Sequence, residues 1–107
     1  MIQLNKLVRD KVPSLVTKDG GSYSLKLLSP LEHQTELTKK LFEEIKEYSM
    51  ASEKAGAVDE LIDIVELAYA AAKLHGYTPE QFEELRHEKR KHKGGFEKGI
   101  YLHTISK

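Results

Sequence analysis

The segment from Ala57 to His75 constrains the fold most, because it is predicted to be a helix with apolar residues around nearly its whole circumference. A helix of this kind must be buried on most sides, and a chain of 107 residues has few other elements to cover it. We therefore expect a second copy of the chain to complete the core. Its two apolar faces consist of Val58, Leu61, Ile62, Val65, Ala68, Tyr69 and Ala72, and of Ile64, Leu67, Ala71 and Leu74.

Two further helices are indicated by capping signals at their N-termini. Residues 29–32 (Ser-Pro-Leu-Glu) and 78–81 (Thr-Pro-Glu-Gln) each combine an N-cap hydroxyl, a proline at the first helical position and a side chain suited to a capping box. The first helix should begin at Pro30 and end between Ser49 and Gly56. The second should end at Gly94-Gly95.

The two ends of the chain are less regular. We expect a short helix near Pro13 and a turn at residues 19–21 (Asp-Gly-Gly). Residues 22–28 and 96–105 are β-prone, so they are candidates to pair with each other or with a partner chain. The prediction is one all-α domain over residues 1–107. It is an antiparallel bundle of three main helices and a short N-terminal helix, with small β-prone segments near both ends, completed by dimerisation.

Two acidic motifs lie on consecutive predicted helices. Glu44 and Glu47 form an E-x-x-E, and Glu60 and Asp63 form an E-x-x-D, so each motif directs two carboxylates to one side of its helix. If the helices fold back on each other across Gly56, all four carboxylates converge and repel one another unless a cation lies between them. An all-oxygen ligand set favours Mg²⁺, or Mn²⁺, over zinc or copper. The alternative is two solvated acidic helix surfaces that share this spacing by chance.

Basic clusters flank the acidic motifs on both sides. Because ammonium and guanidinium groups bind phosphate, and exposed glycine backbone can approach it, these clusters suit a phosphate ligand on the metal. The alternative for the second cluster is a solvated helix face that ends at a glycine cap. The clusters consist of Lys6, Arg9 and Lys11 before the motifs, and of Arg86, Lys89, Arg90, Lys91 and Lys93 after them.

The composition excludes several classes of protein. Lys and Arg together number 17, as do Asp and Glu, so no net charge attracts nucleic acid or an anionic membrane. The absence of cysteine excludes disulfides and thiolate metal sites. The N-terminus lacks the pattern of a secretory signal, and no apolar run reaches the roughly 20 residues of a membrane span. We expect a cytoplasmic protein with no specific binding to nucleic acid.

The chain resembles the all-α nucleotide pyrophosphohydrolases of the MazG-like and phosphoribosyl-ATP pyrophosphatase group. The matching segments are residues 5–13 (NKLVRDKVP), 41–47 (LFEEIKE), 59–63 (DELID) and 94–98 (GGFEK). The resemblance implies a helical bundle that forms a dimer or a dimer of dimers. It also implies Mg²⁺ on Glu44, Glu47, Glu60 and Asp63, and cleavage of the α,β-phosphoanhydride of a nucleotide to a nucleoside monophosphate and pyrophosphate.

Further roles follow as hypotheses from this resemblance. Glu43 or Glu44 is the candidate to orient the attacking water, and Asn5 is a candidate contact to base or sugar. Lys93 stands where the family leads us to expect arginine, and a lysine cannot reproduce a bidentate guanidinium contact. The candidate phosphate contacts are Lys6, Arg9, Lys89, Arg90 and Lys93.

Two rival functions stay open at this level. Within the enzyme class, phosphoribosyl-ATP is the alternative substrate to a nucleoside triphosphate, which would give a role in histidine biosynthesis. Outside it, the chain would be a non-catalytic helical dimer that binds a nucleotide or a protein partner. A saturable Mg²⁺ site distinguishes the enzyme from the non-catalytic dimer, because a solvated acidic face has no such site.

Overall fold

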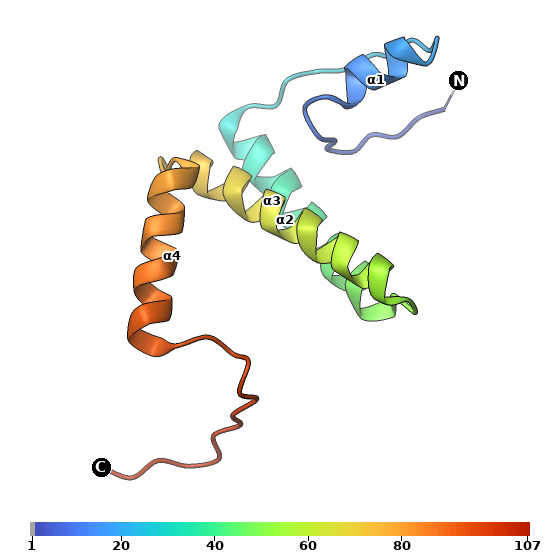
Figure 1. Ribbon diagram of the computed structural model, residues 1–107. Helices are drawn as coiled ribbons and strands as arrows, with labels where there is room; N and C mark the ends of the chain where they lie inside the picture. Colours follow the sequence, from blue (N-terminus) through green and yellow to red (C-terminus); the bar gives the residue numbers. More distant parts are fainter. Residues whose placement is uncertain (1) are drawn as a thin grey trace.

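The computed structural model describes residues 2–107 and folds them into α-helices without β-strands (Figure 1). This confirms the prediction of an all-α chain. The short helix expected near Pro13 and the turn that follows it are present, and Gly20 in that turn has a φ of 85°. The helices are α1 (Val12–Lys18), α2 (Pro30–Met50), α3 (Lys54–Leu74) and α4 (Pro79–Lys93).

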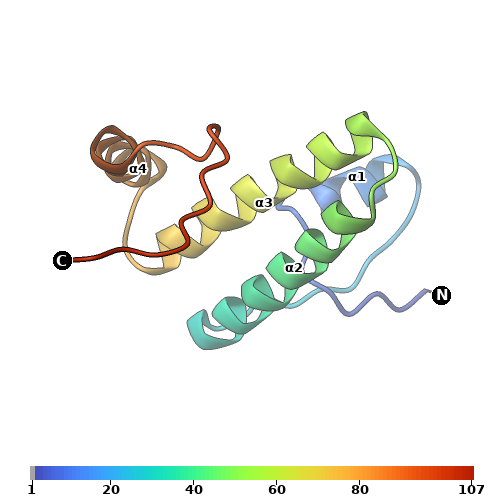
Figure 2. The same cartoon turned by 90° about the horizontal axis from the view of Figure 1, so that it is seen from below.

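Helices α2 and α3 form an antiparallel hairpin, which is the main packed unit of the chain (Figures 1 and 2). The predicted capping box starts α2. The Ser29 hydroxyl accepts a hydrogen bond from the Glu32 N–H at 3.2 Å, and the Glu32 carboxylate accepts one from the Ser29 N–H at 3.0 Å. Leu37 of α2, 3% exposed, is the one buried apolar side chain among residues 2–107. The hairpin is therefore held by a thin apolar seam.

The turn between α2 and α3 differs from the prediction. Ala51 and Glu53 have extended backbone angles and reverse the chain, and α3 begins at Lys54. The expectation that the helix starts at Ala57, after a break at Gly56, was wrong. Gly56 lies inside the first turn of α3, where the backbone N–H groups lack intrahelical partners in any case, so a glycine there does not interrupt the helix.

The connection from α3 to α4 follows the predicted signals. Gly76 has a φ of 89°, which L-residues rarely adopt, and the next N–H, that of Tyr77, donates to the Ala72 carbonyl at 3.0 Å. Thr78 and Gln81 then form the second capping box. At the far end of α4, Gly94 ends the helix as expected.

A small contact cluster holds α4 against the C-terminal half of α3. The rings of Tyr69 and Phe82 meet edge to face with their centroids 5.7 Å apart. The Tyr69 hydroxyl donates to the Glu83 carboxylate at 2.6 Å, and Arg86 donates to the same carboxylate at 2.9 Å. Because α4 contacts α3 and not α2, it stands beside the hairpin and does not close it into a bundle.

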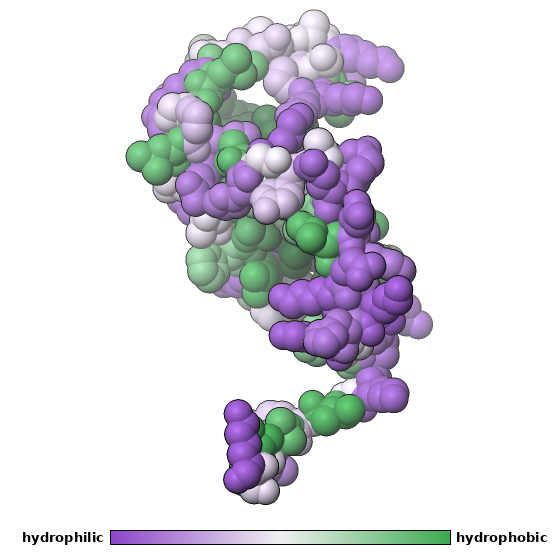
Figure 3. All heavy atoms as spheres, turned by 90° about the vertical axis from the view of Figure 1, so that its left-hand side faces the viewer, coloured by the Kyte–Doolittle hydropathy of each residue, from purple (hydrophilic) through white to green (hydrophobic). Residues whose placement is uncertain are grey.

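The chain is open and elongated. Its radius of gyration is 17.9 Å, against about 13 Å expected for a compact domain of this length. No residue of α3 is fully buried, and Ile62 and Val65 are 52% and 50% exposed. Figure 3 shows hydrophobic side chains exposed at the surface on the face that it displays. A single chain therefore leaves exposed much of the apolar surface of α3, which the sequence pattern predicts to be buried. Dimerisation stays a prediction.

The β-prone segments form no strand. Residues 22–28 connect α1 to α2 and residues 96–105 belong to the C-terminal tail, and the two segments lie apart in the chain (Figure 1). The two segments do not pair with each other, because a strand needs a neighbouring backbone and neither segment finds one within residues 2–107. The alternative, pairing with a partner chain, stays a prediction. Phe96 and Tyr101 of the tail are 98% and 83% exposed.

None of the helices within residues 2–107 combines the length and the apolar character that crossing a membrane requires.

Candidate metal centre

Three of the four predicted metal ligands meet at the α2–α3 hairpin. Glu44 and Glu47 lie one turn apart on α2, and Glu60 faces them from α3. Each offers a carboxylate oxygen, and these three oxygens all lie within 4.8 Å of one another. We call Glu44, Glu47 and Glu60 the acid cluster. The antiparallel hairpin is what brings the two motifs into register.

Two oxygens of the acid cluster are buried without a partner. Glu44 is 5% exposed, and neither its Oε2 nor the Oε2 of Glu60 accepts a hydrogen bond within residues 2–107. A buried carboxylate oxygen without a partner is costly, so these atoms favour a proton or a cation beside them. The oxygens suit a hard divalent cation, whose charge would replace the missing partners. The acid cluster therefore fits a metal.

The carboxylates of the acid cluster also perturb one another. A proton shared with Glu44 raises the pKa of Glu60 to about 7, with further contributions from desolvation and from Glu47. Without a cation, the cluster therefore holds a proton more firmly than separate carboxylates would. Because a metal ligand must be deprotonated, a bound cation would displace this proton.

Asp63, the fourth predicted ligand, lies outside the acid cluster. Its carboxylate instead pairs with the Arg9 guanidinium from the segment before α1. The hydrogen bond to Asp63 raises the pKa of Arg9, and the charges of Glu66 and Asp59 add to this. Asp63, a predicted metal ligand, and Arg9, a predicted phosphate contact, thus bind each other in this structure. Their assigned roles stay predictions.

The N-terminal segment reaches α2 beside the acid cluster. A small hollow lies there, lined by predicted site residues from both segments and by two lysines of α2 that sequence reasoning missed. Lys40 precedes Glu44 by four positions on a predicted helix, and that spacing was the available signal for a shared face. The residues that line this N-terminal hollow are Asn5, Lys6, Leu7, Glu36, Lys39, Lys40 and Glu43.

The predicted cations of α4 lie elsewhere in the chain. Glu60 and the end of α3 at Leu74 are separated by about 21 Å of helix, and α4 starts beyond that end. Arg90 pairs with Glu97 of the tail at 3.1 Å, and Lys93 is exposed at the end of α4. In a single chain, the structure does not bring Lys89, Arg90 or Lys93 to the acid cluster.

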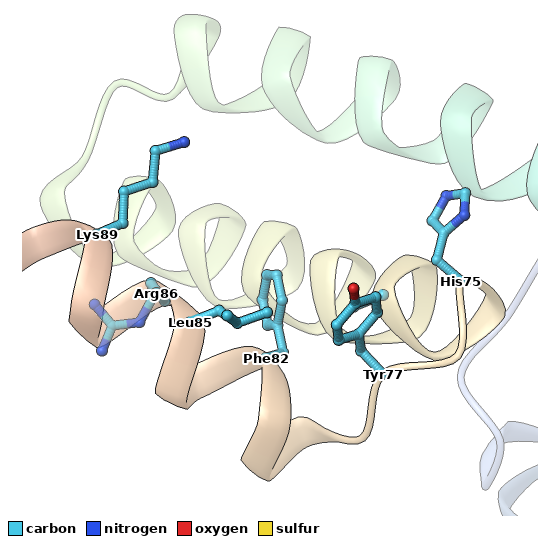
Figure 4. Close-up of a pocket in the computed structure, with 7 residues that line it drawn as sticks. His75, Tyr77, Phe82, Leu85, Arg86 and Lys89 are labelled. Atoms are coloured by element: carbon cyan, nitrogen blue, oxygen red, sulfur yellow. The ribbon is translucent and has the colours of Figure 1, made fainter.

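A larger pocket of about 480 Å³ opens between the end of α3 and α4 (Figure 4). Its walls are mainly apolar, and Lys89 stands at one side of it. It holds no carboxylate and is separate from the acid cluster. Its lining consists of Ala72, His75, Tyr77, Phe82, Leu85, Arg86 and Lys89.

Comparison with known proteins points to one family. A family model described as phosphoribosyl-ATP pyrophosphohydrolase matches residues 2–90. Searches among curated proteins and among solved structures gave no match. The matched region contains the whole acid cluster, Asp63 and the N-terminal segment, and it ends within α4, before Lys93.

Proposed function

Because the chain belongs to the phosphoribosyl-ATP pyrophosphohydrolase family, we propose that it hydrolyses the α,β-phosphoanhydride of a nucleotide and releases pyrophosphate. Membership indicates a pyrophosphohydrolase, a hydrolase that acts on an acid anhydride. One observation carries the proposal for this particular chain. Glu44 and Glu60 each hold a buried carboxylate oxygen without a partner, next to Glu47, as a cation site requires.

The proposed cofactor is Mg²⁺, with Mn²⁺ as an alternative, because the acid cluster offers oxygen ligands alone. When bound, such a cation polarises phosphoryl oxygens and lowers the pKa of a coordinated water. The buried Glu44 and the half-buried Glu60 would hold the cation, and the exposed Glu47 would complete the set of ligands. Asp63 can join them only if it leaves Arg9.

The different burial of Glu43 and Glu44 favours one of them as the residue that orients the attacking water. Glu43 is exposed and lines the N-terminal hollow next to the acid cluster, so its carboxylate is accessible to solvent. Glu44 is buried and is needed as a ligand. We therefore favour Glu43 as the residue that accepts a hydrogen bond from the attacking water and holds it in line.

We further propose that the functional unit is a homodimer or a dimer of dimers. The exposed apolar residues of α3 support this, because a chain that left them in water would lose much of its hydrophobic stabilisation. An assembly would also allow Lys89, Arg90 and Lys93 to reach a metal centre that they do not reach within one chain. We also propose that the enzyme acts in the cytoplasm, which fits a nucleotide as its substrate.

Two substrates compete, and the family description favours phosphoribosyl-ATP. A nucleoside triphosphate is the second candidate. Like phosphoribosyl-ATP it carries a triphosphate, and a cation on the acid cluster would bind only the triphosphate part of either substrate. The test is to incubate the purified chain with Mg²⁺ and each substrate, and to measure pyrophosphate and the nucleotide product. We expect pyrophosphate from phosphoribosyl-ATP, whereas release from triphosphates alone would reassign the substrate. No pyrophosphate from either would contradict the proposed function.

A further inference from the structure

We infer that Lys40 and Lys6, which line the N-terminal hollow, contact the pyrophosphate end of the substrate at the mouth of this hollow, next to the acid cluster. This inference rests on the proposed function and specifies which residues hold the leaving group. Lys40 is the residue whose role is new, since nothing in the acidic motifs marks it.

The position of Lys40 relative to the acid cluster is the first argument. Its ammonium lies 3.9 Å from the Glu44 Oε1, one turn earlier on α2, and its side chain is 24% exposed. This separation is too long for a hydrogen bond, and Lys40 donates none to residues 2–107. Its three N–H donors therefore stay available beside a carboxylate of the acid cluster.

The charge of the N-terminal hollow is the second argument. Lys39 pairs with Glu36 at 3.5 Å, so these two lining residues neutralise each other. Among the other lining residues, Lys6 and Lys40 carry two positive charges against one carboxylate, that of Glu43, although Lys40 also lies beside Glu44 of the acid cluster. The hollow keeps a net positive charge directly beside a negatively charged cluster. This polarity is complementary to that of a metal-bound phosphoanhydride, which combines a cation with negatively charged phosphate oxygens.

Lys40 could instead serve only as a counter-charge for Glu44. This role and a phosphate-binding role predict different effects of removing Lys40 on the affinities for Mg²⁺ and for pyrophosphate. Removing a counter-charge takes a cation away from the metal centre, which strengthens Mg²⁺ binding. Removing a phosphate contact weakens binding of pyrophosphate in the presence of Mg²⁺. A lysine that does both weakens pyrophosphate binding while leaving Mg²⁺ binding equal or tighter.

The test uses the full chain with Lys40→Ala, Lys6→Ala and a control, Lys46→Ala. Lys46 is exposed on the same helix and lines neither the hollow nor the acid cluster. Calorimetry gives the affinity for Mg²⁺ alone and for inorganic pyrophosphate with Mg²⁺, and steady-state kinetics give KM and kcat. Circular dichroism checks that each variant is folded.

We expect Lys40→Ala to weaken pyrophosphate binding by about 10-fold or more and Lys6→Ala by less, with Mg²⁺ binding unchanged or tighter. Lys46→Ala should stay within about twofold of the unmodified chain. Unchanged pyrophosphate affinity in folded Lys40→Ala would overturn the inference. So would a loss of pyrophosphate affinity matched by an equal loss of Mg²⁺ affinity. An unmodified chain that turns over no nucleotide would instead overturn the proposed function, while the pyrophosphate titration would still report on Lys40.

Discussion

Arg9 forms an ion pair with Asp63, 54 positions later in the chain. The pair joins the segment before α1 to α3, one turn after Glu60, and this segment also lines the hollow beside the acid cluster. The contact has two consequences. It anchors the predicted substrate contacts Asn5 and Lys6 near the acid cluster, and it occupies one carboxylate oxygen of Asp63, which lies outside that cluster.

Arg9→Ala should release the N-terminal segment, because its long-range anchor is lost. We expect faster amide hydrogen exchange over residues 5–11 and a change in unfolding free energy of less than about 1 kcal/mol, since the pair is partly exposed. Mg²⁺ affinity gives a second measurement. If Asp63 becomes a ligand, Arg9→Ala tightens Mg²⁺ binding and Asp63→Asn weakens it. Unchanged exchange in Arg9→Ala would contradict the anchoring role.

Mg²⁺ affinity should rise with pH up to about 7 and then level off. The pKa of Glu60 is raised to about 7 from an ordinary value of 4.5. Between these two values the folded chain without metal keeps the Glu60 proton, whereas the unfolded chain loses it. The stability that this proton contributes is therefore lost as the pH rises through 7. A cation must displace the proton, which costs less as the pH approaches the pKa. Calorimetry at several pH values between about 5.5 and 8.5 measures this. A flat profile in the unmodified chain would contradict the coupling.

Gly56→Ala should stabilise the chain by about 0.5–1 kcal/mol in urea unfolding, because alanine is the better helix former. Gly56 lies within α3, and a Cβ added there meets no atom within 4 Å. Gly76→Ala is the matched control, since Gly76 has equally open space but a φ of 89°. The same substitution there should destabilise the chain. Destabilisation by Gly56→Ala would show that this part of α3 does not have its described surroundings.

Tyr69→Phe should loosen α4. It removes the hydroxyl that donates to Glu83 but keeps the ring against Phe82. We expect amide exchange over residues 79–93 to become roughly 3- to 10-fold faster, as the loss of one hydrogen bond implies. Tyr101→Phe provides the control, because Tyr101 is exposed in the tail, where its ring meets that of His103. Equal exchange in both variants would contradict the role of Tyr69.

The helix boundaries were predictable wherever a local signal determines them. Ser29, Thr78, Gly76 and Gly94 act through hydrogen bonds or backbone angles within a few residues, and each ends or begins a helix as expected. Gly56 misled the prediction because glycine is tolerated in the first turn of a helix. The tail at residues 96–105 misled it because β-propensity forms no strand without a neighbour.

The acid cluster was also predictable, since helical spacing and one hairpin suffice to bring Glu44, Glu47 and Glu60 together. The pairing of Arg9 with Asp63 was not, because it depends on how a segment outside the hairpin lies against α3. The separation of Lys89, Arg90 and Lys93 from the acid cluster was equally unpredictable from the sequence. It follows from the packing of α4 on α3 alone, which capping signals do not encode.

The central claim is that the acid cluster holds the cation that pyrophosphate release requires. Its most direct test is the rate of pyrophosphate release with Mg²⁺ from phosphoribosyl-ATP or a nucleoside triphosphate, for the unmodified chain, for Glu60→Gln and for the exposed control Glu84→Gln. Loss of groups that merely support a metal ligand typically costs about 10- to 100-fold. We therefore predict a loss of at least about 100-fold in kcat/KM for Glu60→Gln, with Glu84→Gln unaffected. Full activity in a folded Glu60→Gln chain would contradict the claim.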